Sequence, residues 1–438
     1  MTARLRKRPI AIDLFSGVGG LSLGFEQAGF DVVAAVEIDP IHAAGHKLNF
    51  PDCSVICRDV RTVSGTEIRQ AARIGNRTID VLFGGPPCQG FSLIGHRVLD
   101  DPRNSLVFHF LRLVGELKPR AFVMENVPGM ATGPHTELLS ELIDQFRELG
   151  YKVRLPHRIL NAANFSVPQD RRRLFLIGAR SDTFLPDYPT ALTMPPSNGY
   201  GNTSNGVLAL DLPFCPTAKD ALLDLPNISD YDSLSESDEL PFKLGKGSRY
   251  ASMLRGTAQD ADDYSHPRDW DRAVLTGMLR AEHTPKSVKR FGGTSPGNTE
   301  PVSRFFRIPL NGICNTLRAG TATDRGAFSA PRPIHPIYPR CISVREAARL
   351  HSYPDWFRFH RTIWHGFRQI GNSVPPRLGR AVAASIMAAL GEKPKKPQTR
   401  ISLGDPKLAK FNMKEAAAYF GVDPRVIAPR KRVTSLAS

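Results

Sequence analysis

Short runs of apolar and β-branched residues alternate with stretches of helical periodicity between residues 10 and 180. Apolar residues at helical spacing in 21–28 end before Gly29, and those in 106–117 end before Pro119, as expected of helices that face a core. An alternation of strands and helices builds a largely parallel sheet that is covered on both faces. The pattern therefore predicts a doubly wound, Rossmann-like α/β domain. Its predicted strands lie at 10–15, 32–36, 79–83, 121–124 and 174–178.

The composition changes at residue 181 to one rich in Pro, Gly, Ser and Thr, with acidic patches at 230–239 and 260–271. This stretch has little helical periodicity up to residue 335, which predicts a separate, loop-rich unit. Helical periodicity returns at 344–351 and 377–390. The predicted organisation is a first part of the α/β domain at 1–180, an inserted smaller domain at 181–335, a second part of the α/β domain at 336–390 and a basic appendage at 391–438.

The chain of 438 residues carries 58 Lys and Arg against 42 Asp and Glu, a formal net charge of +16. Residues 391–438 contribute eleven basic and four acidic side chains to this balance. A basic chain indicates an anionic partner such as nucleic acid without identifying that partner.

The six cysteines lack the spacing of a disulfide framework, which indicates a reducing compartment. Cys53 and Cys57 have only His42 and His46 as further candidate ligands, so we expect two half-buried thiols and no metal site. No stretch approaches the roughly 18 consecutive apolar residues of a membrane span, and no signal-peptide core follows the basic N-terminus. We therefore expect a soluble, cytoplasmic protein with no membrane partner.

A glycine-rich turn at residues 13–20 follows the first predicted strand and leads into a helix. Such a turn lets a ligand approach the backbone at a helix N-terminus, although its spacing departs from the G-x-G-x-x-G of dehydrogenases. Glu37 comes about 20 residues later at a strand end, where an acidic side chain typically holds ribose hydroxyls. Asp59, at a third strand end, is placed to receive an adenine amino group. Taken singly, each carboxylate is more often a surface residue or a helix cap.

The second candidate site is the segment 83–92, in which Pro86 and Pro87 precede Cys88 directly after a predicted strand. This stiff loop presents a thiol at the carboxyl edge of the sheet, where doubly wound folds bind ligands. A lone cysteine is usually a buried apolar residue, but packing does not require this neighbourhood of glycines and prolines. Glu125 follows the next strand along the chain. A thiolate and a carboxylic acid at neighbouring strand ends suit attack on an electron-poor ring whose developing charge must be neutralised.

These residues resemble the motifs of a known family, the DNA cytosine-C5 methyltransferases of prokaryotic restriction–modification systems. The glycine turn, the Pro-Cys loop and the Glu-Asn-Val at 125–127 are similar to its first, fourth and sixth motifs. Gln-Asp-Arg-Arg-Arg at 169–173 looks like its Gln-x-Arg-x-Arg motif, while 345–350 and 371–376 look like its ninth and last motifs. The resemblance covers 9–180 and 343–390. It implies a Rossmann-like domain that binds S-adenosylmethionine, without a metal, and a target-recognition domain at 181–335.

The family's cofactor residues carry over to matching positions of this sequence. Phe15 would stack on the adenine of S-adenosylmethionine, Glu37 would hold the ribose hydroxyls, and Asp59 would take the adenine amino group. Asn372 and Val374 would help to close the pocket. The implied cofactor-binding set also contains Gly17, Gly19, Gly20 and Pro87.

The resemblance implies methyl transfer to carbon 5 of a cytosine in a specific duplex DNA sequence. Cys88 would add to C6 of the ring, Glu125 would hydrogen-bond or protonate N3, and Arg173 would contact the carbonyl oxygen. Arg171 would contact a phosphate or the active-site loop. Loss of the C5 proton and expulsion of Cys88 would release the product.

The target atoms lie inside the stack of a duplex, so the cytosine must be flipped out. Residues 92–104 would form the loop that closes over it, and Gln89, Ser92 and Arg103 are candidate DNA contacts. The alternative for Arg103 is a plain loop at the start of a helix.

In the inserted segment, Arg318 follows a Thr-Leu pair that resembles a feature near the end of the family's recognition domains. Arg318 is our candidate for contacting a base, with a phosphate contact as the alternative. Duplex DNA is the expected partner, and a cognate restriction endonuclease a further one. We expect a monomeric, nucleoid-associated enzyme.

The basic appendage contains its own helix signals. Residues 412–415 read as a capping box, Gly421 as the end of the helix, and Asp423-Pro424 as the start of another. This resembles the helix-turn-helix of small DNA-binding modules, and a docked or partly disordered appendage is the alternative.

Three other functions compete with DNA methylation. An RNA cytosine methyltransferase is disfavoured because the inserted segment lacks the Cys-Phe-Thr of that branch. A non-catalytic DNA-binding protein is disfavoured because Cys88, Glu125, Arg171 and Arg173 are all present. The glycine spacing and the Pro-Cys pair argue against a nicotinamide dehydrogenase.

Overall fold

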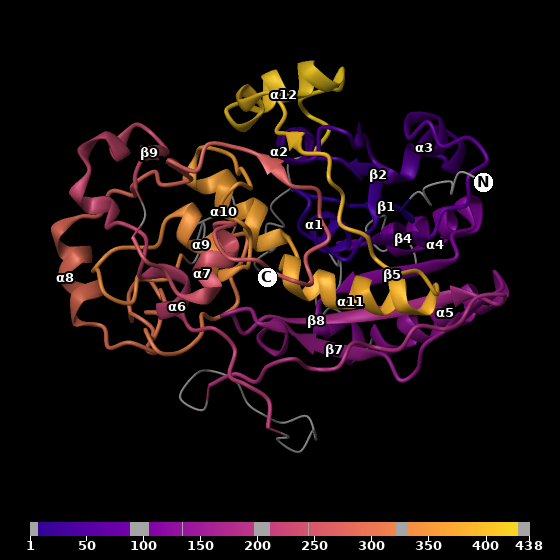
Figure 1. Cartoon of the computed structure of the whole chain (residues 1–438), viewed down its shortest axis with the longest axis horizontal. Helices are drawn as coiled ribbons and strands as arrows, with labels where there is room; N and C mark the ends of the chain where they lie inside the picture. The colour runs from indigo at the N-terminus through magenta and orange to yellow at the C-terminus, as the bar shows by residue number, and fades with distance from the viewer. Residues whose placement is uncertain are drawn as a thin grey trace, which may run out of the picture.

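An eight-stranded sheet forms the centre of the molecule (Figure 1). The computed structural model describes residues 8–87, 105–133, 135–196, 211–243, 245–320 and 332–427. The strand order is β3-β2-β1-β4-β5-β8-β6, with β7 also paired to β8. Strands β1 to β5 are parallel, whereas β8 runs antiparallel to β5, β6 and β7. The strands are β1 (Ile10–Leu14), β2 (Asp31–Glu37), β3 (Ser54–Cys57), β4 (Val81–Gly84), β5 (Ala121–Asn126), β6 (Tyr151–Val153), β7 (Arg158–Asn161) and β8 (Arg172–Arg180).

Helices cover both faces of this sheet, because successive side chains of a buried strand point to opposite faces. In β4, Leu82 packs into one core with α3, α4 and α5, whereas Val81 and Phe83 pack into another with α1 and α11. The predicted doubly wound α/β fold is therefore confirmed. The helices around the sheet are α1 (Gly20–Gln27), α2 (Pro40–Asn49), α3 (Gly65–Ala71), α4 (Ser105–Leu117), α5 (His135–Glu148) and α11 (Pro376–Ala389).

Short elements joined by long connections make up the chain between β8 and α9 (left half of Figure 1). Leu222 and Leu275 of this stretch share a hydrophobic core with Leu350 and Ile370. The segment therefore packs against the part of the chain that returns to the sheet. Its elements and the two helices that follow are α6 (Ala218–Leu222), β9 (Glu239–Pro241), α7 (Arg249–Leu254), β10 (Arg268–Asp269), β11 (Val274–Thr276), α8 (Pro285–Gly293), α9 (Val344–Leu350) and α10 (Ile363–Asn372).

The segment after α11 crosses the molecule and ends at α12 (Met413–Phe420), beside α2 (Figure 1). On its way, β12 (Ile401–Ser402) pairs with β10, and Leu408 packs against Leu48 of α2. The capping box that begins α12 and the left-handed Gly421 that ends it are both formed, as predicted. The helix predicted to begin at Asp423-Pro424 is wrong within the described residues, which end at 427, because the chain at Asp423 makes only a turn. The described part of the appendage is docked.

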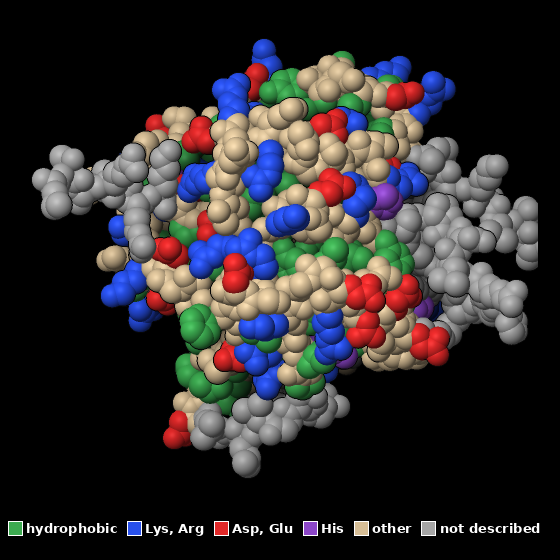
Figure 2. Space-filling view, turned by 90° about the vertical axis from the view of Figure 1, so that its right-hand side faces the viewer, with side chains coloured by type: hydrophobic (Ala, Val, Ile, Leu, Met, Phe, Trp, Pro, Cys, Tyr) green, Lys and Arg blue, Asp and Glu red, His purple; other side chains and the backbone are tan. Residues whose placement is uncertain are grey.

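The face in Figure 2 carries Lys and Arg side chains scattered among acidic ones. The excess positive charge of the chain therefore does not mark a single DNA-binding tract on this face. None of the helices within the described ranges has the length and apolar character needed to cross a membrane.

Candidate active site

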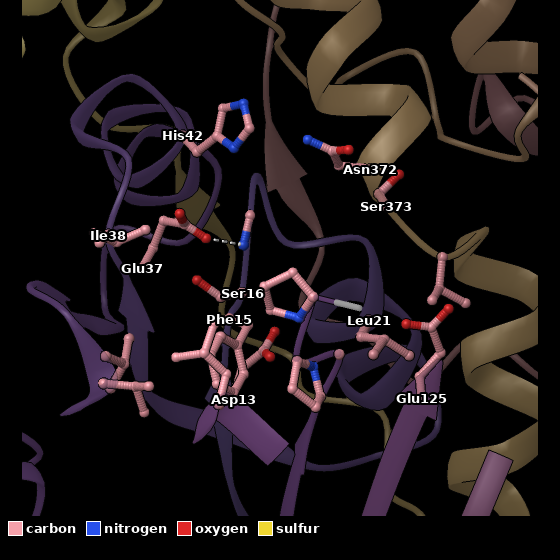
Figure 3. A pocket seen from close by; sticks show the side chains of 18 of the residues that line it. Asp13, Phe15, Ser16, Leu21, Glu37, Ile38, His42, Glu125, Asn372 and Ser373 are labelled. Atoms are coloured by element: carbon pink, nitrogen blue, oxygen red, sulfur yellow. Dashed lines mark hydrogen bonds between the residues drawn. The ribbon is translucent and has the colours of Figure 1, made fainter. Parts of the chain in front are cut away.

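A cavity of about 580 Å³ opens at the carboxyl edge of the parallel strands (Figure 3). Residues at or directly after the ends of β1, β2, β3, β4 and β5 line it, together with the C-terminal end of α10 and the two residues that follow. Gly19, Arg171 and Arg318 do not line the cavity. Cys88, Gln89, Ser92 and Arg103 lie outside the described residues. The predicted site residues that line it are Phe15, Gly17, Gly20, Glu37, Asp59, Pro87, Glu125, Arg173, Asn372 and Val374.

The turn between β1 and α1 brings the backbone to the wall of the cavity. Gly17 and Gly19 have φ angles of +55° and +102°, in the left-handed region that glycine adopts without strain. Phe15 has a φ of +60°, a conformation that is uncommon for a bulky residue and is often found at functional sites. A Cβ atom at Gly20 would lie 2.5 Å from the carbonyl oxygen of Val374. A small residue at position 20 therefore lets the last motif close over the first.

Glu37 fixes this turn from the end of β2. Its Oε2 accepts a hydrogen bond of 2.7 Å from the Gly17 amide, drawn as the dashed line in Figure 3, and its Oε1 accepts one of 2.8 Å from the Asp39 amide. Burial raises the pKa of Glu37, and the neighbouring Asp39 adds to this shift. Each oxygen of a carboxylate has a further lone pair. Glu37 can therefore accept hydrogen bonds from a ligand such as a ribose while it holds the turn.

Asp59 lies at the end of β3 and is held by the residue two positions along. The Arg61 amide donates to Oδ1 at 2.9 Å, and the Arg61 guanidinium donates to Oδ2 at 2.9 and 2.6 Å. Although burial raises the pKa of Asp59, these bonds lower it below its ordinary value. Asp59 is therefore a fixed anion that can accept from an adenine amino group.

Glu125 and Arg173 form an ion pair in the cavity. The Arg173 Nε lies 2.8 Å from Glu125 Oε1, and both side chains are 13% exposed. Burial raises the pKa of Glu125, and Arg173 opposes part of this shift. Burial also lowers the pKa of Arg173, with Glu125 opposing it. A carboxyl group with a raised pKa is suited to hold a proton at a ring nitrogen, and the adjacent guanidinium can donate to a ring oxygen.

The segment that leads to Cys88 lies against this pair. A Cβ atom at Gly85 would lie 2.5 Å from Glu125 Oε2, so a larger residue at position 85 would displace the carboxylate. The Asn126 side chain donates a hydrogen bond of 3.2 Å to the Pro86 carbonyl oxygen. The sequence had assigned no role to Asn126. The structure shows that it ties the Pro-Cys loop to the strand that carries Glu125.

Arg171 has partners that differ from the phosphate contact implied by the resemblance. Its side chain is 1% exposed and donates hydrogen bonds of 2.7, 2.7 and 2.8 Å to the carbonyl oxygens of Leu317, Gly371 and Ser373. Burial lowers its pKa well below the ordinary value. A guanidinium enclosed by the protein in this way does not reach DNA, so the expected phosphate contact is corrected to an internal one. The alternative, a contact with the active-site loop, involves residues outside the described ranges and stays a prediction.

Arg318 is exposed, directly after Leu317, which is 1% exposed. The Thr316 hydroxyl donates to the Asp170 carbonyl oxygen at 2.6 Å, so the Thr-Leu pair is fixed to the segment that carries Arg171. The contact of Arg318 with DNA stays a prediction.

The structure places a further carboxylate, Asp13, in the lining of the cavity. Its Oδ2 accepts a hydrogen bond of 2.6 Å from the Ser22 hydroxyl, whereas its Oδ1 finds no partner among the described residues. Burial raises the pKa of Asp13 well above the ordinary value, and the bond from Ser22 opposes this only in part. The signal in the sequence was a charged residue inside an otherwise apolar strand. Arg368 also lines the cavity, from α10, which was not predicted.

The geometry thus defines a class of enzyme. One side of the cavity holds fixed carboxylates beside a glycine turn, as required for a nucleoside-containing cofactor, and the other holds a carboxyl–guanidinium pair suited to a flat heterocycle. The family model described as "C-5 cytosine-specific DNA methylase" matches residues 10–388. The chain belongs to this family and is an S-adenosylmethionine-dependent DNA cytosine-C5 methyltransferase.

Comparison with curated proteins gives relatives over nearly the whole chain. The type II methyltransferase M.XorII of Xanthomonas oryzae pv. oryzae is 56% identical over 425 residues, which span 97% of this chain and 95% of the relative. The type II methyltransferase M.AgeI of Thalassovita gelatinovora is 31% identical over 86% of this chain and 99% of its own.

Solved structures agree in fold. The crystal structure of a prophage-encoded DNA modification methyltransferase from E. coli has a TM-score of 0.69 and 33% identity, over 88% of this chain and 100% of that one. The methyltransferase EhMeth of Entamoeba histolytica has a TM-score of 0.53 and 16% identity, over 88% of this chain and 99% of its own, and supports the fold alone.

Proposed function

We propose that this enzyme methylates a flipped-out cytosine within one specific duplex DNA sequence, through a covalent bond between Cys88 and C6 of the ring. The observation that carries the proposal is the shared cavity. The Glu125–Arg173 pair, the carboxylates Glu37 and Asp59, and the Pro87 that precedes Cys88 all line it. A ring held by the pair is therefore within the same cavity as a nucleoside cofactor.

The lining fits S-adenosylmethionine, which supplies a sulfonium-bound methyl group when bound. Phe15 offers an aromatic face for the adenine, Glu37 accepts from the ribose hydroxyls and Asp59 from the adenine amino group. The unpartnered Oδ1 of Asp13 fits the ammonium of the methionine part, since a buried carboxylate needs a cationic or donor partner. Asn372 closes the cavity from the C-terminal end of α10. The donor set consists of carboxylates and backbone groups, and the proposed reaction requires no metal.

In the proposed reaction, the Cys88 thiolate forms a bond to C6 of the cytosine, and the electron pair moves to C5. Glu125 holds a proton at N3, so the addition does not leave an unrelieved negative charge. Arg173 keeps the Glu125 carboxyl in place and donates to the carbonyl oxygen of the ring. After methylation, loss of the C5 proton returns the electrons to expel Cys88.

The inserted segment 181–335 is proposed to read the DNA sequence, with Arg318 at a base or a phosphate and residues 92–104 closing over the flipped cytosine. Gln89, Ser92 and Arg103 are proposed to contact DNA. Type II relatives support a cognate restriction endonuclease as a functional partner. We further propose that the enzyme acts as a monomer.

Bisulfite sequencing of DNA from cells that express the protein tests this function. We expect one short sequence to contain a methylated cytosine, and Cys88→Ser to abolish the signal. Glu125→Gln should lower the rate of methyl transfer by about 10²–10⁴ because Gln cannot deliver a proton to N3.

Glu141→Gln, the same change on the exposed surface of α5, is the matched control and should keep full activity. Methyl transfer by Cys88→Ser at the wild-type rate would contradict the covalent mechanism. If a labelled methyl group from S-adenosylmethionine appeared in RNA and not in DNA, DNA would not be the substrate.

A further inference from the structure

Arg171 links two segments that are distant in the sequence. Its Nη1 donates to Leu317 in the inserted segment, and its Nη2 donates to Gly371 and Ser373 at the C-terminal end of α10. A buried charge is costly unless its hydrogen bonds are satisfied, and here carbonyl oxygens of both segments accept from Nη1 and Nη2, while Nε has no partner among the described residues. Movement of either segment would therefore also leave Nη1 or Nη2 of the buried guanidinium without a partner.

The first segment is the end of the inserted region, directly before the exposed Arg318. Its backbone pairs with the strand-like residues next to Arg171, since the Cys314 amide donates to Pro168 at 2.9 Å. The Gln169 Oε1 accepts from the Leu317 amide at 3.1 Å. A residue that reads DNA at this end is thus held by the segment that carries Arg171.

The second segment is part of the cavity wall, because Gly371, Ser373 and Val374 line the cavity. It touches the first segment directly. A Cβ atom at Gly371 would lie 2.2 Å from the Ala319 amide nitrogen. The His351 ring also bridges the two regions, with 2.9 Å from Nδ1 to the Gln169 side chain and 3.2 Å from Nε2 to the Ser373 carbonyl oxygen.

We propose that Arg171 is a positioning residue that couples cofactor binding to DNA binding. The inference rests on the proposed function, in which Arg318 contacts DNA and the turn at Gly371–Val374 contacts the cofactor. When each ligand fixes one of two segments that share a buried partner, binding of one favours the conformation that the other requires. By linkage the effect is reciprocal, so either affinity reports it.

The experiment measures the Kd of S-adenosylhomocysteine by calorimetry, with and without a duplex that contains the sequence found by bisulfite sequencing. In the wild type we expect DNA to tighten this binding by at least about fivefold, the lower end of typical coupling. In Arg171→Met the ratio of the Kd without DNA to the Kd with DNA should fall below about twofold. Arg171→Lys, which retains the charge, should give an intermediate ratio.

The matched control is Arg345→Met. Arg345 is also 1% exposed and also donates to three carbonyl oxygens, those of Thr276, Pro354 and Phe357, but none of these lies in the cavity wall. This variant should lose stability to a similar degree and keep the wild-type ratio. A merely structural role for Arg171 predicts the same behaviour for both variants.

If Arg171→Met does not fold, Gly371→Ala decides in its place, because the added methyl group separates the same two segments. The inference would be overturned if DNA did not change the affinity of the wild type for S-adenosylhomocysteine. It would also be overturned if a folded Arg171 or Gly371 variant showed the same effect of DNA as the wild type. Failure of the proposed function looks different, since the wild type would then methylate no DNA sequence at all.

Discussion

Two regions of this enzyme bury carboxylates, and the pKa values of these groups are shifted in opposite directions. In the cavity, burial raises the pKa values of Asp13, Glu37 and Glu125, whereas the less buried Asp59 is held by Arg61 and has a lowered pKa. At the junction between the inserted segment and α9, the pKa of Glu346 is lowered to about 2 and that of Asp355 is also lowered, because arginines outweigh the effect of burial.

The contacts explain this difference. Both oxygens of Glu346 accept from Arg340, at 2.9 and 2.8 Å, and both oxygens of Asp355 accept from Arg349, at 2.8 and 2.7 Å. Asp13 has no cationic partner of this kind and retains an unpartnered oxygen. Glu346 and Asp355 thus have both oxygens bound by arginines, while Asp13, Glu37 and Glu125 in the cavity keep capacity for a ligand or a proton.

The largest effect should come from removing the cation at the junction. Arg349→Met leaves the buried Asp355 and Asp224 without their main partner, which should lower the free energy of unfolding by about 3–5 kcal/mol. Urea unfolding measures the loss. As a control, Arg147→Met breaks an exposed pair with Asp144 on α5 and should cost no more than about 1 kcal/mol. A loss below about 1 kcal/mol for Arg349→Met would refute the distinction between the two regions.

The second effect is on the cavity. Asp13→Asn replaces a buried carboxyl group that lacks a cationic partner and whose charged form is disfavoured by burial, so the free energy of unfolding at pH 7 should be unchanged or higher. The affinity for S-adenosylhomocysteine should fall by about 10–100-fold, the value of a hydrogen bond to a charged group. Thermal unfolding and calorimetry give the two quantities, with exposed Asp144→Asn as control. Unchanged cofactor affinity would show that Asp13 does not serve the ligand.

The smallest effect is a difference in pH dependence. The folded pKa of Glu346, about 2, lies below its ordinary 4.5, so its contribution to stability is complete above pH 4.5 and is lost as the pH falls toward 2. Within that window one such group changes stability by about 1.4 kcal/mol per pH unit. Asp13 has a raised pKa, so its contribution is complete at low pH and is lost as the pH rises.

Hydrogen exchange at pH 6 and pH 3.5 compares the two regions. Amides of α9 should lose protection on acidification relative to those of β1, after correction for intrinsic rates. Equal loss in both regions would contradict the assignment of opposite shifts.

The sheet was predictable because its signals are local. The five predicted strands correspond to β1, β2, β4, β5 and β8, each a run of apolar residues bounded by turn residues. The short strands β6 and β7 were missed because only pairing with β8 makes them strands. Helix α10 was missed as well: its buried residues depend on contacts with segments distant in the sequence. The proposed domain boundaries stay predictions.

The site was predictable where a motif fixes both residue type and position. The resemblance identified Glu125 and Arg173, and the structure pairs them, although they lie on different strands. It did not reveal Asp13, whose only signal in the sequence is one charged residue inside an apolar strand. Nor did it reveal the partners of Arg171, which come from two distant segments and follow only from the tertiary fold.

The turn that carries Asn372 and Val374 has a consequence for how the enzyme is made. Helix α11 packs on α1, which the ribosome synthesises more than 340 residues earlier. A growing chain therefore completes its sheet and its inserted segment before the cofactor cavity has its last wall. A polypeptide that ends before Gly371 lacks the residues that form this wall of the cavity.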